Sequence, residues 1–315
     1  MLGAPVSIAQ ASDTMGARGT AMAISIFPIN ADFAAEVGDI DLSQGIDEVA
    51  AQAMRDAFWR YAVLIFPAQS LNESDHLRFA ELFGPLETTI GSFRDDVKLR
   101  TGDKIADVSN LDTNNQIWDA SSRQRMFQLG NRLWHTDSSF RHTPARASAL
   151  YARSIAQIGG HTQFADLRAA FDALPAARQQ TLRPLIATHS IFHSRAKLGF
   201  HEFSESERAA LPEVKQVLVR KLPESGRESL YLASHVSGIE GMPSEEAHAV
   251  IAELTAHAVQ RQFVYTHRWR AGDLVIWDNR CTMHRGTEFE DLRWRRDFQR
   301  ATVADTANSV ELMQA

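Results

Sequence analysis

Two residues with metal-binding side chains stand two positions apart near the middle of the chain. They are His135 and Asp137, in the segment 131–140. In an extended strand, side chains two positions apart project to the same side, so these two could share one ion. An imidazole and a carboxylate are two of the three ligands in the 2-His-1-carboxylate arrangement that binds non-haem Fe(II) and leaves positions open for oxygen chemistry. The pair predicts an iron site whose third ligand lies elsewhere.

His284 is the best candidate for the third ligand. The chain has 12 histidines, so a distant histidine alone is a weak signal, and most such residues are surface or core histidines. This one follows a hydrophobic β-type run, stands at a turn-rich strand edge beside Gly286, and precedes an arginine-rich segment. A metal ligand close to an anion-binding arginine is the combination that an iron site with an anionic co-substrate requires.

The arginine-rich segment supplies two candidate anion-binding residues. Arg296 and Arg300 are four positions apart in a predicted strand over 293–303, so they face the same side about 13 Å apart. A buried guanidinium needs an anionic partner, so two inward arginines indicate a dicarboxylate co-substrate and an anionic substrate. The alternative is an exposed basic strand, with Arg293 and Arg295 on its other side.

The elements that must position these residues are strands near both ends of the chain, with helices between them. A final strand over 293–303 follows the others. Segment 88–125 is irregular: it could form a lid or a wall of the substrate site, or it could be a solvated insertion. We predict a β-sandwich or barrel with helical insertions. The other predicted strands are 62–66, 147–155, 161–165, 217–220, 229–233, 263–269 and 274–277; the predicted helices are 46–61, 73–83 after Asn72, 167–174 after Asp166, and 243–258.

The composition excludes several classes of function. The chain has 315 residues, 44% of them hydrophobic and 23% charged, and a net charge of -6, which argues against a nucleic-acid surface. Its one cysteine, Cys281, excludes a disulfide framework and fits a reducing cytoplasm. No apolar run reaches the roughly 20 residues that span a bilayer. We expect a disordered extension over 1–22, one domain over 23–315, and a homo-oligomer.

Three motifs in this order carry a resemblance to a known family. They are the histidine and aspartate of the opening stretch, a histidine about 150 residues later, and the pattern Arg-Arg-x-x-x-Arg-Ala-Thr after it. Together they resemble the taurine dioxygenase family of Fe(II)/2-oxoglutarate-dependent oxygenases, over about 24–305. Within that family, the segments 133–140, 166–175 and 272–281 look most like the phenoxyacetate branch. The His-x-Asp motif alone is weak, whereas the ordered set is specific.

The resemblance implies a fold and a set of cofactor-binding residues. The fold is mainly β with helices, a double-stranded β-helix (jelly roll) with helical insertions. His135, Asp137 and His284 would bind Fe(II). Arg296 would bind the distal carboxylate of 2-oxoglutarate, with Thr162 donating a hydrogen bond to the same group. The remaining co-substrate is O2.

The resemblance also implies residues near the substrate. Asn131 matches a family position near the co-substrate and substrate, and Arg300 would pair with the acidic group of a small anionic substrate. His235 matches a position that lines the substrate pocket in the phenoxyacetate branch, although a loop histidine without such a role is equally compatible with the sequence. That branch carries a second histidine in the same loop, where this chain has Ser237 and Gly238.

The activity that the resemblance implies is hydroxylation of an aryloxyalkanoate such as 2,4-dichlorophenoxyacetate. The products would be a phenol, glyoxylate, succinate and CO2. Two alternatives stay open. Taurine, another sulfonate or an alkyl sulfate could be the substrate of the same iron chemistry, or the chain could be a metal-binding jelly roll without turnover.

Overall fold

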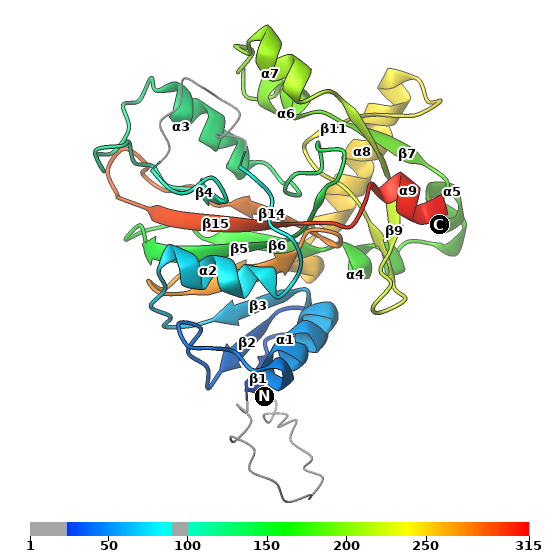
Figure 1. Cartoon of the computed structure of the whole chain (residues 1–315). Helices are drawn as coiled ribbons and strands as arrows, with labels where there is room; N and C mark the ends of the chain where they lie inside the picture. Colours follow the sequence, from blue (N-terminus) through cyan, green and yellow to red (C-terminus); the bar gives the residue numbers. More distant parts are fainter. Residues whose placement is uncertain (1–23, 90–99, 315) are drawn as a thin grey trace, which may run out of the picture.

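The computed structural model describes residues 24–89 and 100–314. The predicted extension 1–22 and part of the irregular segment 88–125 therefore lie outside the described residues. The helices (Figure 1) are α1 (Glu48–Tyr61), α2 (Glu73–Glu81), α3 (Arg123–Gln128), α4 (Leu167–Asp172), α5 (Ala176–Leu182), α6 (Ile191–Ala196), α7 (Glu205–Ala210), α8 (Ser244–Ala258) and α9 (Ser309–Gln314), with short 3-10 helices η2 (Leu129–Arg132) and η3 (Arg261–Phe263).

Within this part of the chain the strands form one large sheet and three small ones. The large sheet has the order β1 (Ser25–Pro28), β2 (Ala35–Gly38), β3 (Val63–Phe66), β13 (Leu274–Asp278), β5 (Ala145–Ser154), β15 (Asp297–Ala304) and β4 (Ile105–Asp107). The small sheets are β12 (Val264–His267), β6 (Thr162–Asp166) and β14 (Thr282–Gly286); β11 (Val236–Ile239), β7 (Ile186–His189) and β8 (Val214–Val217); and β10 (Glu228–Leu230) with β9 (Val219–Lys221). Pairing is antiparallel except between β2 and β3.

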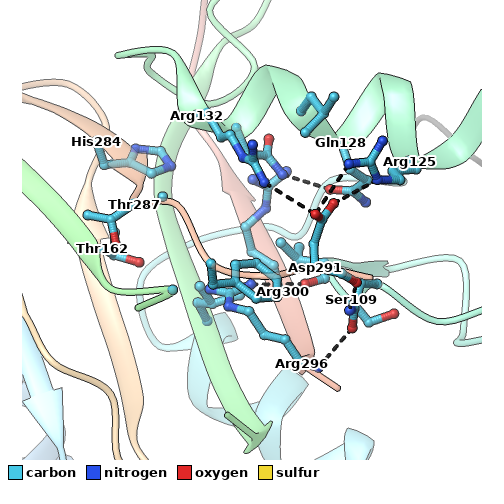
Figure 2. A pocket seen from close by; sticks show the side chains of 18 of the residues that line it. Ser109, Arg125, Gln128, Arg132, Thr162, His284, Thr287, Asp291, Arg296 and Arg300 are labelled. Carbon is cyan, nitrogen blue, oxygen red and sulfur yellow. Dashed lines mark hydrogen bonds and ion pairs between the residues drawn. The ribbon is translucent and has the colours of Figure 1, made fainter. Parts of the chain in front are cut away.

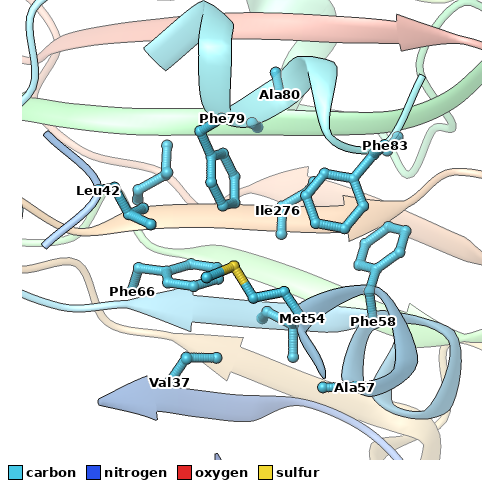
Figure 3. Packing of buried hydrophobic residues seen from close by; sticks show 14 of the residues in the cluster. Val37, Leu42, Met54, Ala57, Phe58, Phe66, Phe79, Ala80, Phe83 and Ile276 are labelled. Carbon is cyan, nitrogen blue, oxygen red and sulfur yellow. The ribbon is translucent and has the colours of Figure 1, made fainter. Parts of the chain in front are cut away.

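Alternate residues of the central strands pack on opposite faces of the large sheet, as the period-2 pattern of a doubly covered strand requires. In β13, Leu274 and Ile276 join the core beneath α1 and α2, while Val275 and Trp277 pack with Phe164 of β6. Figure 3 shows Ile276 among the aromatic side chains of that first core. The large sheet therefore has helices on one face and the sheet containing β6 on the other.

A third cluster of buried residues covers the far side of β6 and β14. Ala165 and Met283 of these strands pack against α4 and α8. The molecule is therefore layered in the order helices, large sheet, small sheet, helices. This is a mixed fold of helices and several mostly antiparallel sheets, and the site lies where β14, β5 and β15 approach one another.

Two helix N-caps predicted from the sequence are confirmed. The Asn72 side chain accepts a hydrogen bond from the backbone N–H of Asp75 at 2.9 Å, and the Asp75 carboxylate accepts one from the N–H of Asn72 at 3.3 Å. Asp166 likewise accepts from the N–H groups of Arg168 and Ala169. Such caps satisfy backbone donors that a helix start leaves unpaired.

The last predicted strand begins later than its residue pattern indicated. It was predicted over 293–303, but β15 starts at Asp297. The segment before it is folded as a loop around Asn110, whose side-chain amide donates to the carbonyls of Asp291 (2.6 Å) and Trp294 (2.8 Å) and accepts from the N–H of Arg296 (2.8 Å). These hydrogen bonds come from a residue far away in the sequence, so they are invisible to a local pattern.

Segment 131–140 is not a continuous strand either. It starts in η2, pairs as a strand only at His135, and then turns at Ser138, whose φ is +50°.

Short helices α5, α6 and α7 were not predicted, because each is too short to show a helical period. Among residues 24–89 and 100–314, no helix is both long enough and apolar enough to cross a bilayer.

The buried histidine of α2 gives the protein a pH-dependent stability. His76 is fully buried, its Nε2 lies 2.9 Å from the carbonyl oxygen of Ala149, and burial lowers its pKa to about 4. Above pH 6.5 the side chain is neutral in both the folded and the unfolded chain. As the pH falls from 6.5 toward 4, only the unfolded chain takes up the proton, so the free energy of unfolding decreases.

We expect His76→Gln to reduce this loss, because glutamine can still donate to Ala149 and does not titrate. Between pH 6 and pH 5 the metal-free wild type should lose about 1 kcal/mol more than the variant. Urea denaturation of both proteins at the two pH values, with a chelator present, measures the difference. Equal losses in the two proteins would contradict a neutral, buried His76.

Candidate metal centre and adjoining anion pockets

The three predicted metal ligands meet in the structure. Ligand atoms of His135, Asp137 and His284 all lie within 4.8 Å of one another, and all three side chains are buried. The Asp137 carboxylate is 3.8 Å from Nε2 of His135 and 3.6 Å from Nε2 of His284. Two backbone hydrogen bonds between His135 and His284, of 3.0 and 2.8 Å, place the first ligand beside β14. The imidazoles of His135 and His284 are thereby held close enough to bind one metal ion together with Asp137.

The surroundings of the imidazoles fix their orientation. Nδ1 of His135 lies 2.7 Å from the carbonyl oxygen of Leu133, so Nδ1 carries the proton and the lone pair is on Nε2, toward the cluster. The ring of His284 packs against Trp277 and Phe164, with ring centroids 4.6 and 6.0 Å away. Such orientation of histidine ligands is usual at metal sites in proteins.

Asp137 is held by a chain of hydrogen bonds that starts on β13. Trp277 donates its indole N–H to the side-chain oxygen of Asn279, and the amide of Asn279 donates to the hydroxyl of Ser148 at 2.9 Å. Ser148 then donates to Asp137 Oδ2 at 2.8 Å. The same oxygen of Asn279 accepts the backbone N–H of Asp137. The turn that follows His135 is thus fixed by contacts from two other strands.

The charges in the cluster favour the state that binds a metal. Burial opposes ionisation of Asp137, but Arg300 and then the two histidines outweigh it and lower its pKa to about 2. Burial also lowers the pKa of His135, and it lowers that of His284 well below the ordinary value. Around neutral pH the site therefore holds two neutral imidazoles and one carboxylate, which is the donor set of a non-haem iron site.

A cavity of about 100 Å³ adjoins the cluster and contains an arginine without a carboxylate partner (Figure 2). Arg296 stacks on Phe298, 3.6 Å from the ring centroid, and donates to the carbonyl oxygen of Val108 at 3.3 Å. Its buried Nε has no hydrogen-bond partner, and burial lowers its pKa to about 10. In the described chain no carboxylate contacts it. A guanidinium in this state is suited to binding an anion that enters the cavity.

Thr162 lines the same cavity and has a hydrogen-bond donor to offer. Its Oγ1 accepts the indole N–H of Trp269 at 3.0 Å, so its own hydroxyl proton is free to point elsewhere. Thr162 starts β6, where it is paired with His267 on one side and Gly286 on the other. The residue is therefore fixed on both sides, and its hydroxyl could donate to the same anion as Arg296.

We expect Trp269→Phe to weaken binding of that anion without unfolding the protein. Phenylalanine keeps the contacts with the rings of His267 and Phe298 but no longer orients the hydroxyl of Thr162. The loss of one hydrogen bond should raise the dissociation constant of 2-oxoglutarate about five- to tenfold. Calorimetric titration in the presence of Mn(II) measures it, and Thr162→Val should give at least as large an effect. An unchanged affinity in both variants would remove Thr162 from the anion site.

The guanidinium of Arg300 contacts Asp137 Oδ1 of the cluster. Its pairing with the acidic group of a substrate stays a prediction. Arg300 also lines both cavities beside the cluster, and its Nε has no partner. Asn131, in η2, lines both cavities too and donates to the side chain of Gln128 at 2.7 Å.

A second, larger cavity of about 530 Å³ also adjoins the cluster. His135, Asp137 and Arg300 line it, together with Phe140 and His235. Nδ1 of His235 lies 2.9 Å from the hydroxyl of Ser194, and the ring packs edge-on against Phe140. His235 therefore lies at this cavity, and its role toward a substrate stays a prediction. Its histidine ring is buried rather than part of an exposed loop.

Much of the irregular segment also faces this cavity. The described residues 104–107, 111–113 and 117–119 all contribute to its wall, and so does Phe203. Within the described part, this agrees with a substrate wall rather than a solvated insertion. Phe192 and Phe200 pack against the ring of Phe203.

Sequence reasoning missed two features of the site. One is Arg195 in α6, a buried arginine at the second cavity. The other is Asp291, which pairs with Arg125 (2.8 Å) and Arg132 (3.6 Å) and so ties α3 and η2 to the loop before β15 (Figure 2). Neither has a motif or a spacing that distinguishes it from a surface charge, so no sequence signal could have found them.

A 2-His-1-carboxylate cluster beside an anion pocket, in a fold built from sheets, defines a candidate iron-dependent oxygenase. The family model described as "Taurine catabolism dioxygenase TauD, TfdA family" matches residues 25–302. The chain belongs to this family. It is therefore an oxidoreductase of the dioxygenase class, as the sequence predicted.

Two curated relatives and one solved structure illustrate the similarity. The alpha-ketoglutarate-dependent 2,4-dichlorophenoxyacetate dioxygenase of Cupriavidus pinatubonensis is 40% identical over 91% of this chain and 99% of its own. The (S)-phenoxypropionate/alpha-ketoglutarate-dioxygenase of Sphingobium herbicidovorans is 31% identical over 92% of this chain and 98% of its own. The crystal structure of AAD-2 in complex with Mn(II) and N-oxalylglycine has a TM-score of 0.83 and 39% identity, covering 91% of this chain and 98% of that one.

Proposed function

We propose that this protein is an Fe(II)- and 2-oxoglutarate-dependent dioxygenase that hydroxylates an aryloxyalkanoate such as 2,4-dichlorophenoxyacetate. The observation that carries the proposal is the position of the His135–Asp137–His284 cluster between two cavities. One cavity contains a guanidinium without a carboxylate partner and a free hydroxyl donor, and the lining of the other includes aromatic rings and the guanidinium groups of Arg195 and Arg300. A dicarboxylate co-substrate and an aromatic acid would each match one of them.

On the co-substrate side, Arg296 and Thr162 would hold the distal carboxylate of 2-oxoglutarate. Arg296 is partly buried, which limits the access of water to this contact and so strengthens the ion pair. The opposite end of the co-substrate would then face His135 and His284, which line the same cavity. The bound iron, with 2-oxoglutarate, would supply oxygen activation, giving succinate and CO2.

On the substrate side, Arg300 would bind the acidic group, and Phe140 and His235 would contact the aromatic ring. Arg300 contacts Asp137 directly, so an acid bound to Arg300 has its neighbouring carbon close to the metal ligands. Hydroxylation of the carbon between the carboxylate and the ether oxygen gives a hemiacetal, which collapses to a phenol and, from an aryloxyacetate, glyoxylate. The protein's part is to position that C–H bond and to bind the two anions.

A substrate panel tests the proposal. The enzyme is incubated aerobically with Fe(II) and 2-oxoglutarate plus 2,4-dichlorophenoxyacetate, 2-phenoxypropionate, taurine or hexyl sulfate. We expect a phenol and succinate in equal amounts from the first acid. Sulfite from taurine, or sulfate from the sulfate ester, without phenol would favour the alternative substrate classes. Consumption of 2-oxoglutarate with no phenol from any aryloxy acid would contradict the substrate assignment.

The proposal extends to the architecture. We infer that the large sheet and the sheet containing β6 are the two sides of a double-stranded β-helix, and that 23–315 forms one domain. The continuous core between them, through Phe164 and Trp277, supports this arrangement. We further propose a homo-oligomer in the cytoplasm. Light scattering after size-exclusion chromatography measures the oligomeric state, and limited proteolysis that leaves one core fragment is the result expected for a single domain.

A further inference from the structure

Arg195 differs from the other deeply buried arginines of the described chain. It is 6% exposed, yet no carboxylate contacts it in residues 24–89 or 100–314. Its comparably buried counterparts each pair with an acid: Arg168 with Asp166, Arg220 with Asp305, and Arg280 with Asp278 and Glu224. Leaving a charged group buried and unpaired is costly, so such a group marks a place where a partner of opposite charge binds.

The guanidinium of Arg195 is held in place by contacts that do not neutralise it. It stacks on Phe127, 4.3 Å from the ring centroid, and Nη1 donates to the hydroxyl of Ser194 at 3.3 Å. It also lies flat on the backbone at Gly130, where a Cβ would come within 2.2 Å of Nη1. Its buried Nε has no partner. The side chain is therefore positioned in advance, with donor capacity left over.

Arg195 is part of the wall of the large cavity. Arg195 lines the cavity of about 530 Å³ together with Arg300 and the ring of His235, but it does not line the smaller cavity of Arg296. The charges of Arg195 and Arg300 repel each other, and burial lowers the pKa of Arg195 to about 10. An anion bound between the two guanidinium groups would remove this repulsion.

We propose that Arg195 binds the carboxylate of the primary substrate, sharing it with Arg300, which lines the same cavity. The inference rests on the proposed function, because it takes the large cavity as the substrate site. Each of the two arginines without a carboxylate partner then binds one of the two acids. Arg296 binds the distal carboxylate of 2-oxoglutarate, and Arg195 binds the carboxylate of the aromatic acid. The acid is thus held at two points, which orients its α-carbon as well as binding it.

The decisive experiment varies the charge of both partners. Binding of phenoxyacetate and of its neutral amide is measured by calorimetry on the protein loaded with Mn(II) and N-oxalylglycine, for the wild type and for Arg195→Gln. We expect the variant to bind the acid about 10- to 100-fold more weakly, since a hydrogen bond to a charged group is lost. Its affinity for the amide and for N-oxalylglycine should stay within twofold of the wild type.

A nearby arginine provides the control. Arg208 also stacks on aromatic side chains, Phe192 and Phe203, but its side chain is exposed. Arg208→Gln should leave the affinities for acid and amide unchanged. If Arg195→Gln binds the acid as tightly as the wild type, the inference is overturned. If the wild type binds no aryloxy acid, the proposed function fails instead, so the two failures are distinguishable.

A second variant covers the case in which Arg195→Gln does not fold. In Gly130→Ala the added methyl group would occupy the place of the guanidinium, so Arg195 must move while its charge stays in the protein. The same selective loss of affinity for the acid is expected. Unchanged acid affinity in Gly130→Ala, with the amide also unchanged, would count against a role for the position of Arg195.

Discussion

Asp137→Asn is expected to abolish iron binding and, with it, all turnover of 2-oxoglutarate. The carboxylate is the only anionic member of the ligand cluster, and an amide would leave the metal's charge uncompensated in a buried site. Substitution of a residue that only hydrogen-bonds to a metal ligand typically lowers metal affinity roughly 10- to 100-fold. Removal of the ligand itself should therefore lower the affinity for iron about a thousandfold or more. The expected activity is below detection at any practical iron concentration.

Two measurements test this expectation, one of metal affinity and one of activity. Anaerobic titration with Mn(II) gives the affinity without redox chemistry, and CO2 release from labelled 2-oxoglutarate gives the activity. Ser148→Ala, which removes only the 2.8 Å hydrogen bond to Oδ2, should lie between the wild type and Asp137→Asn in both assays. The surface variant Asp172→Asn, which affects an exposed ion pair with Arg227, should behave as the wild type. Stoichiometric Mn(II) binding by Asp137→Asn would contradict the ligand assignment.

The metal cluster could be predicted because its members carry chemistry in their residue types. A histidine and an aspartate two apart are recognisable whatever the backbone does between them. The extended geometry on which the pairing of the two residues was argued ends at His135, because the chain turns at Ser138. What brings Asp137 to the histidines is the hydrogen-bond chain through Asn279 and Ser148, which joins residues more than a hundred positions apart. A local pattern cannot encode that contact.

The arginines illustrate the same limit. Arg296 and Arg300 were grouped by strand spacing, but only Arg300 lies in β15, since Asn110 folds the preceding segment into a loop. Both nevertheless line the same cavity. Arg168 and Arg280 are buried like Arg195, but each has an acid beside it. Arg195 differs only in having no carboxylate contact within the described structure, and the sequence does not reveal such a difference. Helix caps, in contrast, depend on neighbours in sequence and were predicted.

Arg296→Met is expected to raise the dissociation constant of 2-oxoglutarate at least about a hundredfold while leaving the metal-free fold intact. The distal carboxylate would lose its charged partner in a buried cavity, which costs more than the loss of an exposed ion pair. Methionine keeps the apolar contact with Phe298, over whose ring the guanidinium lies at 3.6 Å. Arg296→Lys retains the charge without the planar fork, so it should fall between Arg296→Met and the wild type.

The stability of the variants distinguishes a binding residue from a structural one. In the described chain Arg296 has no carboxylate partner, so its replacement by methionine removes a partly buried charge without breaking an ion pair. Unfolding free energy in the absence of ligand should therefore stay equal or rise. At a 2-oxoglutarate concentration one hundred times its dissociation constant, the ligand should stabilise the Mn(II)-loaded wild type by about 2.7 kcal/mol. It should do so for the exposed control Arg293→Gln as well, but not for Arg296→Met. The contrary outcome is that Arg296→Met is less stable than the wild type without 2-oxoglutarate and is still stabilised when 2-oxoglutarate is added. Arg296 would then be a structural residue, because the fold and not the binding would depend on its charge.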